Sequence, residues 1–193
     1  TAWSVFGQIV ILLLIQIGGL GVITIMSGIL IGLHRRIGLG DRMLMQDAFN
    51  LNSLTGLVRF TKKVIIGTFA VEGVGALLYM TVFVPRFGAK GIWISIFNAV
   101  SAFCNAGMDI MADNSLCDYV TNPVINGVTS ALIILGGIGY IVWWDIIRVY
   151  SYRKTGIKSR INRLTLHSKI AILATVLFIV IGVCFPIASA KIE

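Results

Sequence analysis

The residues best suited to chemistry lie in a short apolar run, 97–109 (FNAVSAFCNAGMD), which ends in small polar residues and a glycine. The run is too short to cross a bilayer, but a segment long enough to cross lies on each side of it. This layout is typical of a re-entrant pore loop, in which a half-helix enters the membrane and extended backbone returns to the same face. A short external helix followed by an ordinary loop is the alternative, and spacing alone leaves both open.

Extended backbone at membrane depth could bind a cation, because its unpaired carbonyls can replace the water around the ion. Gly107 fits this role, since a residue without a Cβ atom readily adopts the positive φ values that turn successive carbonyls toward one axis. The half-helix would also point its negative, C-terminal end at the site, which favours a cation over an anion.

Other chemistry has little support in the sequence. His34 and His167 both fall at the expected cytoplasmic ends of spans, and no nucleophile–base pair is apparent, so we expect no enzyme. Cys104, Cys117 and Cys184 form no Cys-x-x-Cys or Cys/His cluster, so a structural metal site is not predicted.

The composition indicates a membrane protein. Of 193 residues, 57% are hydrophobic, the mean hydropathy is +0.92, and the 12% that are charged amount to about half the globular norm. A soluble domain of this size could not bury so much apolar surface, so we expect an all-α, multi-pass protein of the cell membrane. The net charge of +8 does not indicate nucleic acid, because no basic domain with interleaved aromatic residues accompanies it.

The charges cluster in a way that predicts the topology. Thirteen of the 16 Lys and Arg residues fall in 35–63 and 148–169, whereas 85–123 contains two of them against three Asp. By the positive-inside rule the first two segments are cytoplasmic and the third is external, with both chain ends outside.

Four spans and one re-entrant helix are expected along the chain. The predicted spans cover 3–33, 64–84, 124–147 and 168–189; the first belongs to the segment 1–36 and the last to the segment 168–193. A re-entrant helix is predicted over 91–103, followed by an extended return over 104–109. Residues 37–63 are predicted to form an amphipathic cytoplasmic linker, and 148–167 a basic cytoplasmic loop. The chain starts at Thr1 without an initiator Met, and we expect it to be part of something longer.

Glu72 is the only carboxylate deep in any predicted span, and a buried carboxylate is costly. It could act in the ion path, or it could form a structural hydrogen bond to a neighbouring helix. Gln16 lies at similar depth in the first span and is the partner we expect in the second case.

One internal repeat is visible at an offset of 118 residues. Its two copies share three glycines at the same spacing: Gly18, Gly19 and Gly21 in the first, and Gly136, Gly137 and Gly139 in the second. Both copies lie in spans predicted to run from outside to inside, so the repeat is parallel. Such glycines usually let helices pack closely.

Three blocks resemble the Ktr/Trk/HKT superfamily of potassium transporters, most closely its Ktr-type membrane subunits. They are 6–21, 101–109 (SAFCNAGMD, where the family usually has SAFNNAGFD) and 135–143. The resemblance implies a potassium-channel-like fold of four span–pore-loop–span repeats around one ion path. This chain would hold the closing span of repeat one, all of repeat two (64–147) and the opening span of repeat three.

The resemblance also implies a site. The backbone carbonyls of Cys104, Asn105, Ala106 and Gly107 would supply one quarter of the ion coordination, with K⁺ at the last three. Ser101, Met108 and Asp109 would support this filter. Cys104 replaces the usual Asn and Met108 the usual Phe, and because carbonyls coordinate the ion we expect the filter to survive both changes and Cys104→Asn to be nearly silent.

The function expected from this resemblance is K⁺ transport by a pore-forming subunit, with dependence on Na⁺ left open. No cofactor is expected beyond the transported ion. The implied partners are lipid, the remaining repeats, a second copy of the subunit, and a cytoplasmic nucleotide-binding regulator. A non-conducting scaffold and a secondary transporter for another cation are the alternatives, although the latter would more often show inverted repeats.

Overall fold

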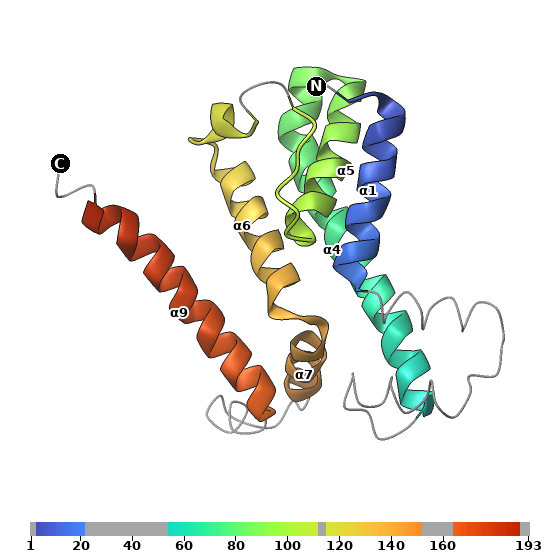
Figure 1. The fold of residues 1–193 in the computed structure, drawn as a ribbon, viewed down its shortest axis with the longest axis vertical. Coiled ribbons are helices and arrows are strands. Elements are labelled where there is room, and N and C mark those ends of the chain that lie inside the picture. The colour runs from blue at the N-terminus through green and yellow to red at the C-terminus, as the bar shows by residue number, and fades with distance from the viewer. Residues whose placement is uncertain (1–2, 22–53, 112–114, 152–163, 190–193) are drawn as a thin grey trace. The chain divides into compact units, whose positions relative to one another are not determined.

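The computed structural model describes residues 3–21, 54–111, 115–151 and 164–189, and within these ranges it is helical and contains no strand (Figure 1). The all-helical class predicted from composition is confirmed there. The chain forms two compact units, Thr1–Gly137 and Ile138–Glu193. Most of the predicted linker, up to residue 53, and residues 152–163 of the predicted basic loop lie outside the described residues.

Helix α1, Val5–Leu20, opens the first unit. Ser4 caps it by accepting a hydrogen bond from the Gly7 N–H at 3.2 Å, which satisfies one of the unpaired donors of the first turn. The helix ends at Gly21, whose φ of +77° is a left-handed value that favours glycine. The span predicted over 3–33 is therefore helical as far as Leu20, and its remainder lies outside the described residues.

Helix α4, Leu54–Phe87, is longer than the predicted span 64–84 at both ends. Pro85, the residue after the predicted span, lies inside the last turn of the helix. The part from Thr61 to Phe87 is long and apolar enough to cross a membrane. Among the described helices it is the only unbroken one that meets both conditions, with α9 counted from Leu166 to Gly182.

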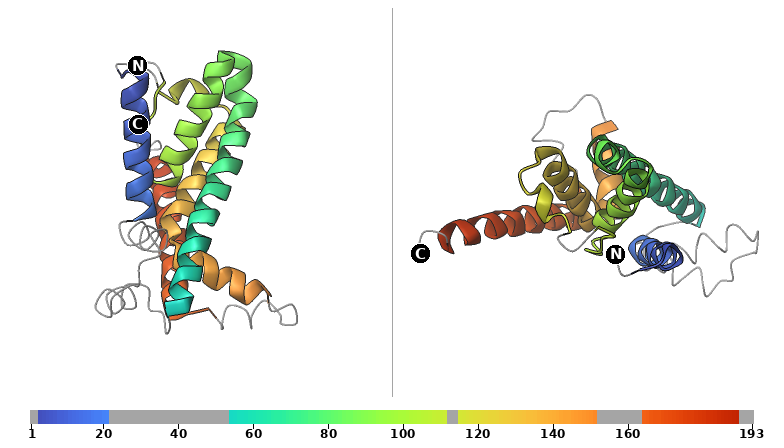
Figure 2. Two further views of the ribbon diagram at one scale, coloured as in Figure 1. Left: turned by 90° about the vertical axis from the view of Figure 1, so that its right-hand side faces the viewer. Right: turned by 90° about the horizontal axis from the view of Figure 1, so that it is seen from above.

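Helix α5, Ala89–Phe103, follows after the single residue Gly88, whose φ of +58° allows an abrupt reversal. The helix therefore returns along the C-terminal half of α4, and α1 packs beside it (Figures 1 and 2). Gly91 makes this approach possible, because a Cβ atom there would lie 2.4 Å from the carbonyl oxygen of Phe83. Phe83, Phe97 and Phe103 are buried in this unit.

Helix α6, Pro123–Ile138, begins after Asn122, whose Oδ1 atom accepts the backbone N–H of Val124 at 3.0 Å. Helix α7, Tyr140–Ser151, starts two residues after α6 ends. Gly139 separates them with a φ of +89°, so the span expected over 124–147 is two helices rather than one. Together they have the length and hydropathy of one broken span.

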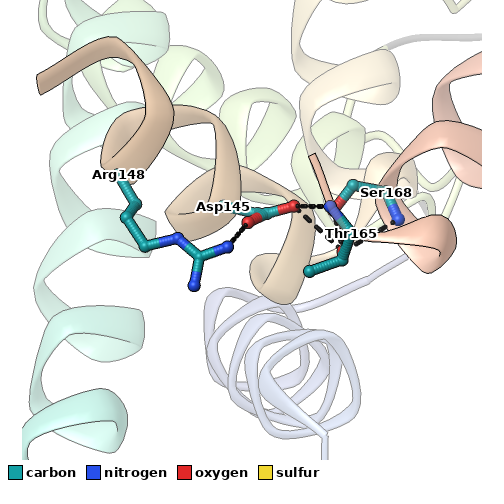
Figure 3. Close-up of polar contacts among 4 residues, drawn as sticks. All are labelled: Asp145, Arg148, Thr165 and Ser168. Atoms are coloured by element: carbon teal, nitrogen blue, oxygen red, sulfur yellow. Dashed lines mark hydrogen bonds and ion pairs between the residues drawn. The ribbon is translucent and has the colours of Figure 1, made fainter. Parts of the chain in front are cut away.

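The second unit contains α7 and α9, Leu166–Ser189, which contact each other. The contact is organised by Asp145, a buried carboxylate on α7 (Figure 3). One of its oxygens accepts the backbone N–H of Thr165 at 2.8 Å and the Thr165 hydroxyl at 2.9 Å, while the other pairs with Arg148. Thr165 in turn caps α9 by accepting the N–H of Ser168 at 3.3 Å.

Candidate functional site

The candidate site is the backbone that follows α5, residues 104–109, which returns beside that helix without regular pairing (Figure 1). Cys104 still donates its N–H to Val100 at 2.9 Å, in the manner of a helix end. Asn105 and Gly107 then take left-handed φ values of +54° and +67°. The positive φ predicted for Gly107 is present, whereas that of Asn105 was not predicted, although Asn tolerates this region better than most residues.

Ser101 fixes the loop to the end of α5. Its carbonyl accepts the N–H of Ala106 at 2.9 Å, and its hydroxyl oxygen accepts the N–H of Met108 at 2.9 Å while donating to the Met108 carbonyl. Ser101 is buried, so these bonds are shielded from competing solvent. One side chain thus closes the loop over seven residues and determines how tightly it curves.

Asp109 orders the outer end of the same loop. One carboxylate oxygen accepts the backbone N–H of Met111 at 2.8 Å, and the other accepts the hydroxyl of Ser115. The side chain of Met108, by contrast, is 46% exposed. Of the three residues expected to support the filter, Ser101 and Asp109 make hydrogen bonds through their side chains, and Met108 takes part through its backbone.

Two of the repeat glycines lie in close contact with the end of α5 and the start of the loop. A Cβ atom on Gly19 of α1 would lie 2.2 Å from the Sγ atom of Cys104, and one on Gly136 of α6 would lie 1.8 Å from the carbonyl oxygen of Phe103. We expected these glycines to let helices approach one another. Gly136 does so at Phe103, the last residue of α5, whereas Gly19 leaves room for the side chain of Cys104, which follows that helix.

The other repeat glycines have different roles. Gly18 has open space where a side chain would project, and Gly137 has only the Asn105 side-chain amide near it, at 3.9 Å. Gly21 and Gly139 are equivalent in the repeat and share the left-handed backbone, with φ values of +77° and +89°. Both copies of the motif therefore end a helix at their third glycine.

Glu72 lies beside the loop and is 4% exposed. Gln16 donates to both of its carboxylate oxygens, at 3.0 and 3.1 Å, so the partner expected from the sequence is present. The thiol of Cys104 lies 3.8 Å from one of those oxygens. The carboxylate therefore contacts α1 and the first residue of the loop at once.

Two hydrogen bonds between the helices around the loop were not predicted from the sequence. Trp93 on α5 donates its indole N–H to Gln8 on α1 at 2.8 Å, and the hydroxyls of Tyr79 and Thr129 join α4 to α6 at 2.6 Å. A polar residue inside an apolar run was the available signal in each case. A cavity of about 210 Å³ lies against the loop, and Tyr79, Asn98 and Thr129, from α4, α5 and α6, line it together with residues of the loop itself.

Comparison with known proteins identifies the family of the chain. The family model described as TrkH, cation transport protein, matches residues 1–188. The chain is 40% identical over 181 residues to the potassium/sodium uptake protein NtpJ of Enterococcus hirae, covering 93% of this chain and 38% of that protein. It is 37% identical over 178 residues to the Ktr system potassium uptake protein B of Bacillus subtilis, with coverage of 92% and 38%.

A third relative, the Ktr system potassium uptake protein B of Vibrio alginolyticus, is 29% identical over 181 residues, covering 93% of this chain and 38% of that protein. The chain thus spans less than half the length of the curated relatives it matches. All three relatives carry the names of ion uptake proteins, which agrees with the expectation of transport rather than catalysis. Because the family model covers nearly the whole sequence, the chain belongs to the TrkH family of cation transport proteins.

Proposed function

We propose that the full-length protein is the ion-translocating subunit of a K⁺ uptake system in the cell membrane, and that this chain supplies one strand of its selectivity filter. The observation that carries the proposal is the loop after α5. It leaves a short apolar helix, takes left-handed φ values at Asn105 and Gly107, and is held between two glycine-bearing helices. Backbone of this kind at membrane depth is tolerated only where it is buried in protein or lines a water-filled cavity, and an ion path is such a cavity.

The backbone carbonyls of Cys104, Asn105, Ala106 and Gly107 are the proposed ligands, with K⁺ held at the last three. Each of the four repeats would contribute such a strand, so this chain provides one quarter of the coordination. Ser101 supports the proposal because it curves the loop through three hydrogen bonds to Ala106 and Met108. Asp109 would hold the outer end through Met111 and Ser115.

The proposed domain arrangement follows the repeat. Helix α1 closes repeat one, 64–147 forms repeat two with α5 as its pore helix, and α9 opens repeat three. The left-handed glycines that end α1 and α6 at equivalent positions support this assignment. The arrangement requires four spans, with 37–63 and 148–167 on the cytoplasmic side.

The names of the relatives suggest which ions the protein transports and that it assembles with partners. One is named a potassium/sodium uptake protein and another a potassium uptake protein of a Ktr system, and we propose K⁺ as the transported ion with Na⁺ as a second candidate ion. The word "system" supports an assembly of several subunits. By the family resemblance, these would be two copies of this subunit and a cytoplasmic nucleotide-binding regulator.

The test is Gly107→Ser in the full-length protein, expressed in cells that lack K⁺ uptake. A side chain at φ +67° is strained, so the loop should shift and both the apparent K⁺ affinity and the K⁺/Na⁺ preference should fall. Gly73→Ser is the matched control, because Gly73 lies within α4 and has open space around it. If Gly107→Ser changes neither property, the loop does not line the filter.

The same cells separate the alternatives. A scaffold would support no ion flux in any variant, even with its partners present. A secondary transporter for another cation would accumulate that cation in preference to K⁺, with a fixed stoichiometry to a coupling ion. We favour K⁺ uptake because two of the relatives at 37% identity or more carry K⁺ in their names.

A further inference from the structure

Glu72 joins three parts of the first unit that are distant in sequence. The residue lies on α4, Gln16 lies on α1, and Cys104 is the first residue after α5. Gln16 donates to both carboxylate oxygens at 3.0 and 3.1 Å, and the Cys104 thiol reaches one of them at 3.8 Å. Two donors therefore converge on a single side chain that is 4% exposed.

The side chain of Cys104 is confined on its other side as well. A Cβ atom on Gly19 would lie 2.2 Å from Sγ and 2.7 Å from the Cys104 Cβ atom, so only glycine leaves room for this thiol. The sulfur atom thus lies between the α1 backbone and the Glu72 carboxylate. A smaller or larger side chain at residue 104 would lose one contact or press on the other.

We propose that Glu72 and Cys104 form a latch that sets the position of the first filter carbonyl, so that the Cys104 side chain helps to determine ion preference. The inference rests on the proposed function. Cys104 directly follows the last residue of α5, and its carbonyl is the first of the four proposed ligands. Selectivity depends on the number and placement of carbonyl ligands, so a shift of this residue alters the coordination directly.

Gln16 extends the latch to the neighbouring repeat. By donating to both carboxylate oxygens it fixes the orientation of Glu72, and α1 also supplies Gly19. The closing helix of repeat one thereby positions the filter strand of repeat two. Glu72 and Gln16 are positioning residues in this scheme, because they act on the ion only through Cys104.

The experiment measures K⁺ uptake by the full-length protein, with its native partner subunits, in K⁺-uptake-deficient cells over a range of external K⁺ with Na⁺ as competitor. Cys104→Ala removes the thiol, and we expect the half-saturating K⁺ concentration to rise and the K⁺/Na⁺ preference to fall by roughly three- to tenfold, the scale of one lost hydrogen bond. Cys104→Ser retains a small donor and should restore most of both. Cys117→Ala is the matched control, because this free cysteine is exposed outside the loop.

The double variant Cys104→Ala with Glu72→Gln makes the coupling visible. If the two residues act as one latch, Glu72→Gln should weaken K⁺ preference by itself but add little once Cys104 is Ala. All rates are compared at equal amounts of protein in the membrane, so that a loss of folding is not read as a loss of selectivity.

Two results would overturn the latch. One is a Cys104→Ala variant that matches Cys117→Ala in both affinity and preference. The other is a Glu72→Gln variant that lowers only the amount of protein or the maximal rate, which would leave Glu72 as a structural helix–helix contact. Failure of the proposed function is recognised separately, because the unmodified protein would then support no K⁺ uptake.

Discussion

Gly136 on α6 contacts the backbone at Phe103 so closely that a Cβ atom on residue 136 would lie 1.8 Å from the Phe103 carbonyl oxygen. The contact joins the helix after the loop to the last residue of α5, immediately before the candidate ligands. Because both sides of the contact are backbone, no side-chain rotation could relieve a clash. The second glycine motif thus sets how closely α6 can approach the candidate filter.

Gly136→Ala should therefore impair the full-length protein severely. Either α6 or the loop must move, at a cost of roughly 1–3 kcal/mol or more. We expect reduced K⁺ uptake per membrane-inserted molecule, measured by uptake assays normalised to surface protein. Gly18→Ala is the control, since nothing lies within 4 Å of a Cβ atom there. Equal behaviour of the two variants would contradict the close packing of Gly136 on Phe103.

For Cys104→Asn the contacts of the side chain lead to a prediction that differs from the nearly silent change expected from the sequence. The Asn side chain could donate to Glu72, but it is larger than a thiol and must fit against Gly19. We now expect a measurable shift in K⁺/Na⁺ preference, smaller than that of Gly107→Ser. Competition of Na⁺ with K⁺ uptake would reveal the shift. An unchanged K⁺/Na⁺ preference would mean that Cys104 acts through its backbone carbonyl alone.

Tyr79→Phe should destabilise the packing of α4 on α6. The Thr129 hydroxyl donates to the Ile125 carbonyl at 2.7 Å, so the proton in the 2.6 Å contact comes from Tyr79. Losing that bond should cost about 1 kcal/mol, seen as a lower Tm of the purified protein. Thr129→Ser keeps the acceptor and should leave Tm close to that of the unmodified protein. If both variants melt alike, the hydroxyl contact contributes nothing measurable.

Asp145→Ala should loosen the second unit, because it removes the acceptor of the Thr165 N–H and hydroxyl at the start of α9. The loss of two bonds to a buried carboxylate should cost roughly 1–3 kcal/mol and lower Tm. Arg148→Gln is the informative comparison: the Arg148 side chain is 60% exposed, and such ion pairs contribute little. A larger effect from Arg148→Gln than from Asp145→Ala would refute this ranking.

The predicted topology can be tested at Ser159, which lies outside the described residues. An impermeant thiol reagent should fail to label Ser159→Cys in intact cells and should label it after the membrane is opened, because the segment carries the basic residues of a cytoplasmic loop. Labelling from outside intact cells would invert the topology and move the candidate filter to the cytoplasmic side.

The sequence by itself determined the features that depend on local chemistry. Extreme hydropathy specified a helical class, and the need for φ > 0 within a short apolar run singled out Gly107. A carboxylate inside an apolar span must find a donor, and Gln16 was a polar residue at matching depth, so the pair with Glu72 could be anticipated. Each of these follows from a residue type and its immediate surroundings.

Only the tertiary structure decided what the repeat glycines touch. Spacing aligned Gly19 with Gly137, yet the close contacts fall on Gly19 and Gly136, because Gly19 meets the Cys104 side chain whereas Gly136 meets the Phe103 carbonyl. The break at Gly139 was equally hidden, since a glycine inside an apolar run fits either a continuous or an interrupted helix. The proposed role of the Cys104 side chain depends on contacts that α1 and the end of α5 make with the Glu72 carboxylate on α4. The spacing of these residues along the chain does not predict that they lie together.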